Sequence, residues 1–189
     1  MNRKLINTIF AVTAVWFFGG CGASNYYILS NISTPKTTYA KNLQMIGIEK
    51  VSVPKYLFKR EIAIARSNSE VSFFNNAEWA EDMDEGLTHR LIGFVQKKFN
   101  QPQVYAYPWG LDKQPDIKIS VQITRYIAFG DQVYLDANWR IENMYTHKSS
   151  ARLFTVAVPT KQDSKSIVDA MDRAFGKLED DLAKGLYKF

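Results

Sequence analysis

One residue of this chain has an unmistakable chemical context, the lone cysteine Cys21. It ends the run Phe-Gly-Gly-Cys at 18–21, after a short apolar stretch that follows Arg3 and Lys4. A membrane-spanning helix needs roughly 20 apolar residues. This stretch is shorter and has the proportions of a signal peptide, and the two glycines are small enough for a signal-peptidase cleft. The pattern predicts a bacterial lipoprotein signal at 1–20 that is cleaved before Cys21.

The chemistry that this context predicts is acylation of the Cys21 sulfur. A lone exported cysteine cannot form an intramolecular disulfide, and a thioether-linked lipid explains its presence. A diacylglycerol group, with a further acyl chain on the new amine, contributes about 0.8 kcal/mol per buried methylene. We therefore expect covalent lipid on Cys21 and no other cofactor. The alternative is an ordinary secretory signal followed by a free thiol.

The sequence gives little support to a catalytic or metal site. Its two histidines, His89 and His147, are not spaced as a metal-ligand set. No serine lies in a Gly-x-Ser-x-Gly elbow, and no phosphate-binding loop of the Gly-x-x-x-x-Gly-Lys type occurs. Clustered acids can hydrolyse glycosidic bonds, but they also stabilise a helix N-terminus. The clustered acids here are Glu78, Glu81, Asp82, Asp84 and Glu85. We predict no catalytic residues and no bound metal.

Size and charge limit the kind of partner. The chain has 189 residues and a formal charge of +5, which falls to +3 when Arg3 and Lys4 leave with the signal. The mature part has the size of one domain and can bury a core without disulfides. It is exported and shows no cluster of Lys and Arg, so we expect no nucleic-acid partner.

Alternating apolar residues predict a series of strands separated by turn residues. The expected strands are 26–29, 45–53, 59–67, 70–74, 103–107, 116–129, 132–143 and 150–159. Ser67-Asn68-Ser69 and Gly130-Asp131 lie between neighbouring strands, which predicts two hairpins. The last strand has apolar side chains on both sides, which predicts burial on both faces.

Two segments have the period of an amphipathic helix. In the first, an i, i+4 apolar series runs from Trp79 to Phe99, so we expect a helix over 77–99 with Asn76 as its N-cap. The second begins near Asp163, where a weak capping box follows, and its apolar stripe continues to Leu186.

Together these elements predict an α+β domain. A single mixed, mostly antiparallel sheet with two long amphipathic helices packed on one face buries every apolar stripe. The expected organisation is a cleaved signal at 1–20, a lipidated N-terminus with a short strand and linker at 21–44, and a single domain at 45–189.

Aromatic residues near loops and strand ends are candidates for a partner interface, because exposed aromatics commonly mark protein or membrane contacts. Trp79 and Trp139 lie on apolar stripes and are expected in the core instead. The candidate interface residues are Tyr26, Tyr27, Pro108, Trp109, Tyr126 and Phe129.

Several of these features, in this order, resemble one family, the ABC-type transport auxiliary lipoproteins. The matching positions are Cys21, Tyr26-Tyr27-x-Leu29, Val51-x-Val53-Pro54-x-Tyr56-Leu57 with Arg60 and Ile62, Trp79-Ala80, Ile117-x-Ile119-x-Val121 and the hairpin return ending at Trp139. The family often has Pro shortly after the Trp-Ala pair, where this chain has Glu81-Asp82-Met83. Acidic residues suit a first helical turn as Pro does.

The resemblance implies a function as well as a fold. It implies a non-catalytic, periplasm-facing lipoprotein that holds one end of a lipid-transport system with an MCE-domain protein at a membrane. It also implies a homo-oligomer, because ring-like self-association is known in the family. Only Cys21 carries over as a functional residue. Gly22 rather than Asp follows it, which under the enterobacterial sorting rule favours the outer membrane over the inner.

Two other functions stay open at this point. The chain could be a structural lipoprotein of another envelope assembly, such as a secretion or pilus apparatus, and would then co-purify with proteins of that apparatus. It could also be an envelope hydrolase acting on peptidoglycan or lipid, and its activity would then depend on Glu78 or His89.

Overall fold

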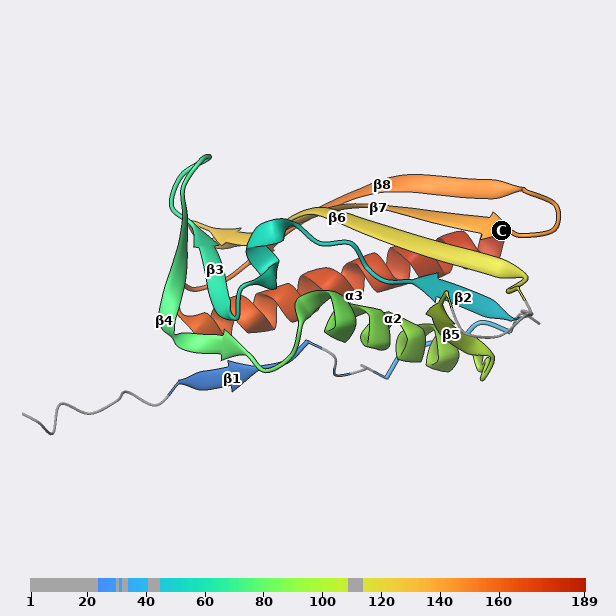
Figure 1. Cartoon of the computed structure of the whole chain (residues 1–189), viewed down its shortest axis with the longest axis horizontal. Coiled ribbons are helices and arrows are strands. Elements are labelled where there is room, and N and C mark those ends of the chain that lie inside the picture. Colours follow the sequence, from blue (N-terminus) through green and yellow to red (C-terminus); the bar gives the residue numbers. More distant parts are fainter. Residues whose placement is uncertain (1–23, 30, 32–33, 41–44, 109–113) are drawn as a thin grey trace, which may run out of the picture.

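One open eight-stranded sheet and two long helices make up the part of the chain that the structure describes (Figure 1). This computed structural model describes residues 24–29, 31, 34–40, 45–108 and 114–189, so Cys21 and Trp109 lie outside the described residues. The strands are β1 (Asn25–Tyr27), β2 (Ile46–Glu49), β3 (Glu61–Ala65), β4 (Val71–Trp79), β5 (Val104–Tyr107), β6 (Ile117–Phe129), β7 (Gln132–Asn143) and β8 (Ser149–Pro159). The helices are the short 3₁₀ helix η1 (Lys55–Phe58), α2 (Met83–Phe99) and α3 (Ser164–Lys188).

Strand β6 is the axis of the sheet. One of its edges pairs antiparallel with β7, which in turn pairs antiparallel with β8. Its other edge takes short parallel segments in succession: β2, then a bridge between Ser52 and Gln122, then β3. From these segments the sheet widens to β5 on the β2 side and to β4 and β1 on the β3 side. The sheet is mixed and its longest ladders are antiparallel, as predicted.

Both long helices cover the same face of the sheet, which confirms the predicted α+β class (Figure 1). Helix α3 lies along β7 and β8, and α2 lies beside it under β2 and β5. The apolar stripe of α3 is buried throughout, at Ile167, Met171, Phe175, Leu178, Leu182 and Leu186. Full burial of such a side chain contributes about 1.5–3 kcal/mol. Neither α2 nor α3 is long and apolar enough to cross a membrane, a result that covers the described residues only.

The first long helix begins later than predicted, at Met83 rather than at 77. The preceding residues extend β4, where Ala77 and Trp79 pair with β1. Trp79 is in the core as expected, but it projects from a strand. Its spacing of four residues to Met83 equals the spacing of apolar residues in a helix, although the two lie in different elements. Its backbone N–H donates to the Arg60 carbonyl at 2.7 Å. Strand pairing therefore satisfies the donors that a first helical turn would leave free, and the N-cap is Asp82 instead of Asn76.

Strand β8 is mostly exposed, so the prediction that it is buried on both faces is wrong. It lies at the edge of the sheet and pairs only with β7 among the described strands. Phe154, Val156 and Val158 turn toward α3 and are at least half-buried. On the opposite face Leu153 is 83% exposed, because the helices cover only one side of the sheet.

A buried ionic cluster joins the two long helices to the segment that follows β1. Arg90 of α2 is 1% exposed, and its Nε and Nη2 donate to the two carboxylate oxygens of Glu179 on α3 at 3.1 and 3.0 Å. Its Nη1 donates to the Leu29 carbonyl at 3.2 Å and to the Asp172 carboxylate. A buried charge is stable only when it is paired and hydrogen-bonded, so these contacts fix how α2, α3 and Leu29 lie together.

Burial raises the pKa of Glu179 to about 7, although the Arg90 guanidinium favours the charged carboxylate. Burial also opposes the charge on Arg90, but Glu179 and Asp172 outweigh it and raise the pKa of Arg90. Arg90 therefore stays charged throughout the physiological range, and Glu179 is the member of this cluster that gains or loses a proton.

Helix α3 lies close to Trp139 of β7 at Gly185. A Cβ at this position would overlap the Trp139 ring and lie 2.9 Å from its Cζ2. The ring cannot move away freely, because its Nε1 donates to Asp181 of α3 at 3.0 Å. A Cβ at Gly176, on the same helix, would meet nothing nearer than 3.6 Å.

We predict opposite effects for alanine at these two glycines. Alanine is about 1 kcal/mol more favourable than glycine inside a helix, so Gly176→Ala should raise the free energy of unfolding by up to that amount. Gly185→Ala should lower it by about 1–3 kcal/mol, because the methyl group overpacks the core against Trp139. Urea unfolding followed by circular dichroism measures both. If both variants changed the free energy of unfolding equally, α3 would not lie as close to β7 at Gly185 as the structure has it.

We also predict a pH-dependent stability that originates at Glu179. An unfolded glutamate titrates near 4.5 and the folded one at about 7, so the folded protein binds this proton more tightly between these values. The free energy of unfolding should therefore fall as the pH rises from 4.5 through 7. The contribution is up to about 3 kcal/mol, since one pKa unit corresponds to about 1.4 kcal/mol.

The control is Glu179→Gln, which keeps a carbonyl acceptor for Arg90 but has no proton to titrate. Urea unfolding at intervals across this pH range should give a flatter profile for the variant than for the wild type. If the stability of the wild type and of the variant changed with pH in the same way, the titrating group would be a residue other than Glu179.

Candidate functional site

The predicted interface residues do not form one surface. Tyr26 is 62% exposed and Tyr27 half-buried on β1, and Phe129 is 40% exposed where β6 ends. These three lie at the end of the molecule where β1, the β3–β4 hairpin and the β6–β7 turn meet, which we call the β1 end (Figure 1). Pro108 is exposed after β5, at the opposite end. Trp109, like Cys21, lies outside the described residues.

Tyr126 is not available to a partner, because it is fully buried. Its hydroxyl donates to the Met171 carbonyl of α3 at 2.6 Å, and burial raises its pKa well above the ordinary value. The reason is a bulge in β6 between Ile123 and Arg125. The bulge shifts the alternation by one residue, and therefore turns Tyr126 inward. The sequence selects Tyr126 as an interface candidate because it lies near a turn, and the apolar pattern does not reveal the bulge that buries it.

Strand β1, which the chain enters shortly after Cys21, is firmly attached to the core. Its three residues pair parallel with β4, and the Tyr27 carbonyl accepts from Ala80 N–H at 2.9 Å. The Tyr27 hydroxyl lies 3.2 Å from the Ser164 hydroxyl at the start of α3. Two residues later, the Leu29 carbonyl accepts from Arg90. Strand β1 and the residues up to Leu29 are thus held by the sheet and by both long helices.

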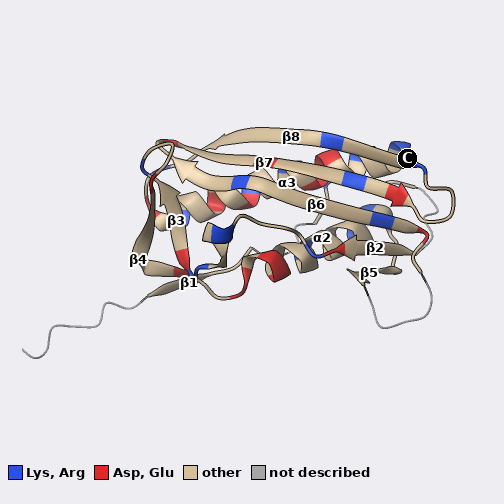
Figure 2. Ribbon diagram, turned by 45° about the horizontal axis from the view of Figure 1, so that its top comes forward, with Lys and Arg blue, Asp and Glu red and all other residues tan. Residues whose placement is uncertain are grey.

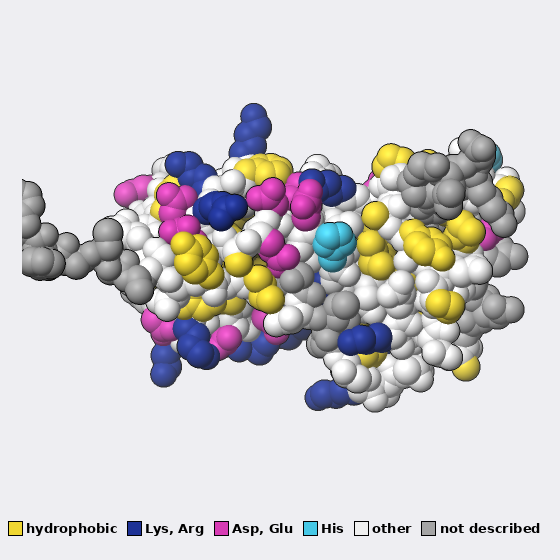
Figure 3. Space-filling view, turned by 60° about the horizontal axis from the view of Figure 1, so that its bottom comes forward, with side chains coloured by type: hydrophobic (Ala, Val, Ile, Leu, Met, Phe, Trp, Pro, Cys, Tyr) yellow, Lys and Arg dark blue, Asp and Glu magenta, His cyan; other side chains and the backbone are white. Residues whose placement is uncertain are grey.

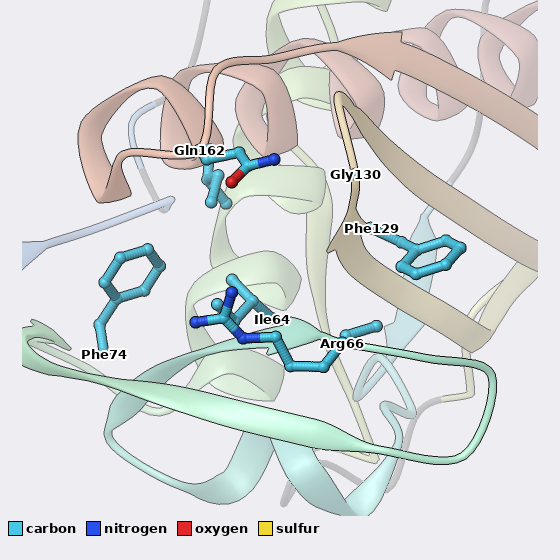
Figure 4. Close-up of a pocket in the computed structure, with 8 residues that line it drawn as sticks. Ile64, Arg66, Phe74, Phe129, Gly130 and Gln162 are labelled. Carbon is cyan, nitrogen blue, oxygen red and sulfur yellow. The ribbon is translucent and has the colours of Figure 1, made fainter.

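The β1 end contains a partly enclosed pocket of about 220 Å³ (Figure 4). Its lining comes from β3, β4, the β6–β7 turn and the start of α3, and we call it the Phe74 pocket. The lining residues are Ile64, Ala65, Arg66, Phe74, Phe129, Gly130, Gln162 and Ile167. Its walls are largely apolar, with one cationic and one amide side chain. It is smaller than the roughly 300–1,000 Å³ of a site for a drug-sized ligand.

A second pocket, of about 250 Å³, lies next to it and shares Ala65 and Phe129. Its wall includes Arg125, which pairs with Asp136 at 2.6 Å and lies 4.5 Å from the centre of the Tyr134 ring. The cation of this pocket therefore has partners already.

The C-terminus lies at the opposite end of the molecule from β1 (Figure 2). A more polar hollow of about 480 Å³ includes the last residue, Phe189, in its lining. Cationic side chains surround it, and its floor is Trp139 and Gly185. The cations are Lys148, Arg152, Lys184 and Lys188. Arg152 is paired with Asp181 at 2.9 Å, and Lys148 donates to the terminal residue Phe189 at 3.1 Å. Part of this positive charge is thus already compensated within the chain.

The residues that could support hydrolysis do not converge. His89 and His147 are both exposed, on α2 and in the β7–β8 turn. Glu78 belongs to β4, whereas Asp84 and Glu85 of α2 contact Lys50 at 2.9 and 3.3 Å. Within the described residues, no group of three or more His, Cys, Asp or Glu is arranged to hold a metal ion. The arrangement therefore offers surfaces and pockets rather than a set of reacting groups.

Exposed hydrophobic side chains are dispersed on the face that carries β1, α2 and β5. Figure 3 shows them as small groups separated by polar and charged side chains. Scattered apolar residues of this kind are normal on a soluble surface. The pockets at the two ends, rather than this face, are the features that distinguish the surface.

Comparison with solved structures supports the fold. A crystal structure of a protein from Xanthomonas campestris, assigned to the family DUF330, superposes with a TM-score of 0.69 at 16% identity. The match covers 84% of this chain and 92% of that one. A crystal structure described as an uncharacterized protein gives a TM-score of 0.69 at 17% identity over 87% of this chain and 99% of that one. At such identities the likeness shows a shared fold only.

Comparison of sequences shows the family. The chain is 22% identical over 138 residues to the intermembrane transport lipoprotein PqiC of Escherichia coli K12. The matched part is 70% of this chain and 72% of that protein, and the PqiC of Shigella flexneri matches equally. The model of the ABC-type transport auxiliary lipoprotein component matches residues 27–183, from the end of β1 into α3. The chain therefore belongs to the ABC-type transport auxiliary lipoprotein family, as the sequence motifs indicate.

Proposed function

We propose that this protein is a non-catalytic, lipid-anchored subunit of an envelope lipid-transport system that contains an MCE-domain protein. The observation that carries the proposal is the family match over 27–183, which begins inside the strand that follows Cys21. Only residues 22–26 separate the anchor residue from the matched domain. In this proposal Cys21 carries a diacylglycerol group and an N-linked acyl chain, and the domain presents a docking surface to the transporter.

The attachment of β1 supports a holding role. A tether is useful only if the segment next to it is fixed to the folded body. Here that segment is fixed by the β1–β4 ladder, by Tyr27 and by the bond from Arg90 to the Leu29 carbonyl. The domain therefore keeps a defined orientation relative to its own N-terminal strand.

The proposed partners are an MCE-domain protein and further copies of this chain. Among the described strands β8 pairs only with β7, and its Leu153 is 83% exposed. A partner can cover this surface, because an unpaired strand edge readily accepts another strand. We propose that the copies form a ring. The proposed location is the cell envelope, facing the periplasm, with the outer membrane favoured over the inner by Gly22.

Two features favour a non-catalytic role. A relative is described as a transport lipoprotein. His89 and His147 are exposed on separate elements, and Asp84 and Glu85 are paired with Lys50. The energy and the lipid path of the system would therefore be supplied by other chains.

The test is removal of the anchor by Cys21→Ala, behind an ordinary secretory signal so that the protein is still exported. We expect the variant to fold, with an unchanged circular dichroism spectrum, but to be released from membranes and to lose function in a complementation assay. The matched control is Ala23→Ser, which alters the same tail and keeps the thiol. Wild type and control should co-purify with an MCE-domain protein after detergent extraction.

Two results would contradict this proposal. Full complementation by the soluble variant would show that anchoring is unnecessary. A pull-down that returns secretion or pilus proteins and no MCE-domain protein would favour a structural lipoprotein of another envelope assembly.

A further inference from the structure

The Phe74 pocket combines apolar walls with a cation, Arg66, that has no counter-ion among the residues that the structure describes. Ile64, Phe74 and Ile167 provide much of its apolar wall. Phe129 lines it where β6 ends, although its ring points away from Ile64 and Phe74 in Figure 4. Figure 4 shows the Arg66 guanidinium extending back over Ile64 toward Phe74, with Gln162 on the opposite side. Arg66 is exposed, and its side chain makes no ion pair within the described part of the chain. The pocket is thus suited to a ligand with an apolar part and an anionic part.

The position of the pocket indicates where such a ligand would come from. Strands β1 and β4 are parallel, with Asn25 opposite Ala77. Phe74 precedes Ala77 on β4 by a distance of roughly 10 Å, at about 3.3 Å per residue. Cys21 precedes Asn25 by a chain that can span at most about 14 Å. Whatever path those residues take, a lipid on Cys21 keeps the β1 end, and the pocket with it, close to the bilayer surface.

The size of the pocket limits the ligand to part of a lipid. A volume of about 220 Å³ is too small for a whole phospholipid and fits a segment of one acyl chain. A chain that moves from the bilayer into an apolar pocket gains little, since both surroundings are apolar. Net affinity must therefore come from the headgroup, and a guanidinium pairs with phosphate through two parallel hydrogen bonds.

We propose that the Phe74 pocket binds one acyl chain of a membrane phospholipid, whose phosphate pairs with Arg66. The inference rests on the proposed anchoring for the location of the bilayer, and it deepens that function by giving the domain a lipid contact of its own. It assigns Phe129, one of the predicted interface residues, to a lipid site rather than to a protein contact.

The test uses phosphatidylglycerol with a photoactivatable diazirine in one acyl chain, mixed into phosphatidylcholine vesicles with the mature lipidated protein. After illumination, mass spectrometry should find the label on peptides that contain Ile64, Phe74 or Phe129. Gln162→Trp places an indole at the mouth of the pocket from an exposed loop residue, so folding is not at risk. It should reduce labelling at least fivefold, whereas Lys161→Trp, at the exposed neighbouring residue, should leave it unchanged.

The headgroup contact has a separate pair of variants. Arg66→Gln should reduce labelling roughly tenfold, as expected for the loss of a charge-assisted hydrogen bond. Lys161→Gln removes a nearby exposed charge and should have little effect. If Arg66→Gln and Lys161→Gln weaken labelling equally, the phosphate meets a diffuse positive surface and the assignment to Arg66 is overturned.

The Cys21→Ala variant, with a short-chain form of the same probe dissolved as monomers, separates this inference from the proposed function. Here no anchor and no bilayer are needed, so labelling at the pocket would support the lipid site even if the transport role were wrong. Labelling of Cys21→Ala but not of the lipidated protein would show that the anchor's own acyl chain fills the pocket. Absence of pocket labelling in both proteins, as expected if the pocket takes an apolar side chain of a protein partner, would refute the proposal.

Discussion

The pairing of Arg90 with Glu179 is the constraint on which much of this fold depends. A guanidinium that is almost fully enclosed needs acceptors in a defined geometry, and these come from α3 and from the Leu29 carbonyl. Removing Glu179 would take away the buried partner of this charge, at a cost that is large relative to a net stability of roughly 5–15 kcal/mol. The two helices can therefore move neither apart nor along each other without disturbing the N-terminal segment. Helices α2 and α3 and the N-terminal segment at Leu29 therefore form one structural unit.

Much of the architecture is predictable from the sequence because it follows from periodicity. The β6–β7 hairpin, the long stripe of α3 and the burial of Trp139 all follow from apolar spacing over many residues. Errors occur where a tertiary feature interrupts the period. Trp79 and Met83 are four residues apart across a strand-to-helix boundary, and a single bulge in β6 turns Tyr126 inward. The exposure of β8 depends on which face of the sheet the two helices cover. The sequence of β8 alone does not indicate that face.

The candidate functional features also differ in how far the sequence alone predicts them. Acylation at Cys21 is predicted by a short contiguous motif, since a signal peptidase reads the chain in extended form. The Phe74 pocket is assembled from residues as distant as Ile64, Phe129 and Ile167, and no local pattern could bring them together. The aromatic criterion does select Phe129, but only because it is a large side chain near a turn. The residues that surround Phe129 in the pocket become visible only in the folded chain, as does the lack of an ion pair for Arg66 among the described residues.

The parallel pairing of β1 with β4 has a mechanical consequence. A pull on an N-terminal tether is transmitted along the axis of β1, whereas the hydrogen bonds of the ladder run across it. Such a pull shears the bonds of the ladder together instead of peeling them off one after another. Beyond the ladder the same pull would have to break the contact of Leu29 with a buried guanidinium. A strand of three residues, weak by itself, is thus held to the domain against a pull along its own axis.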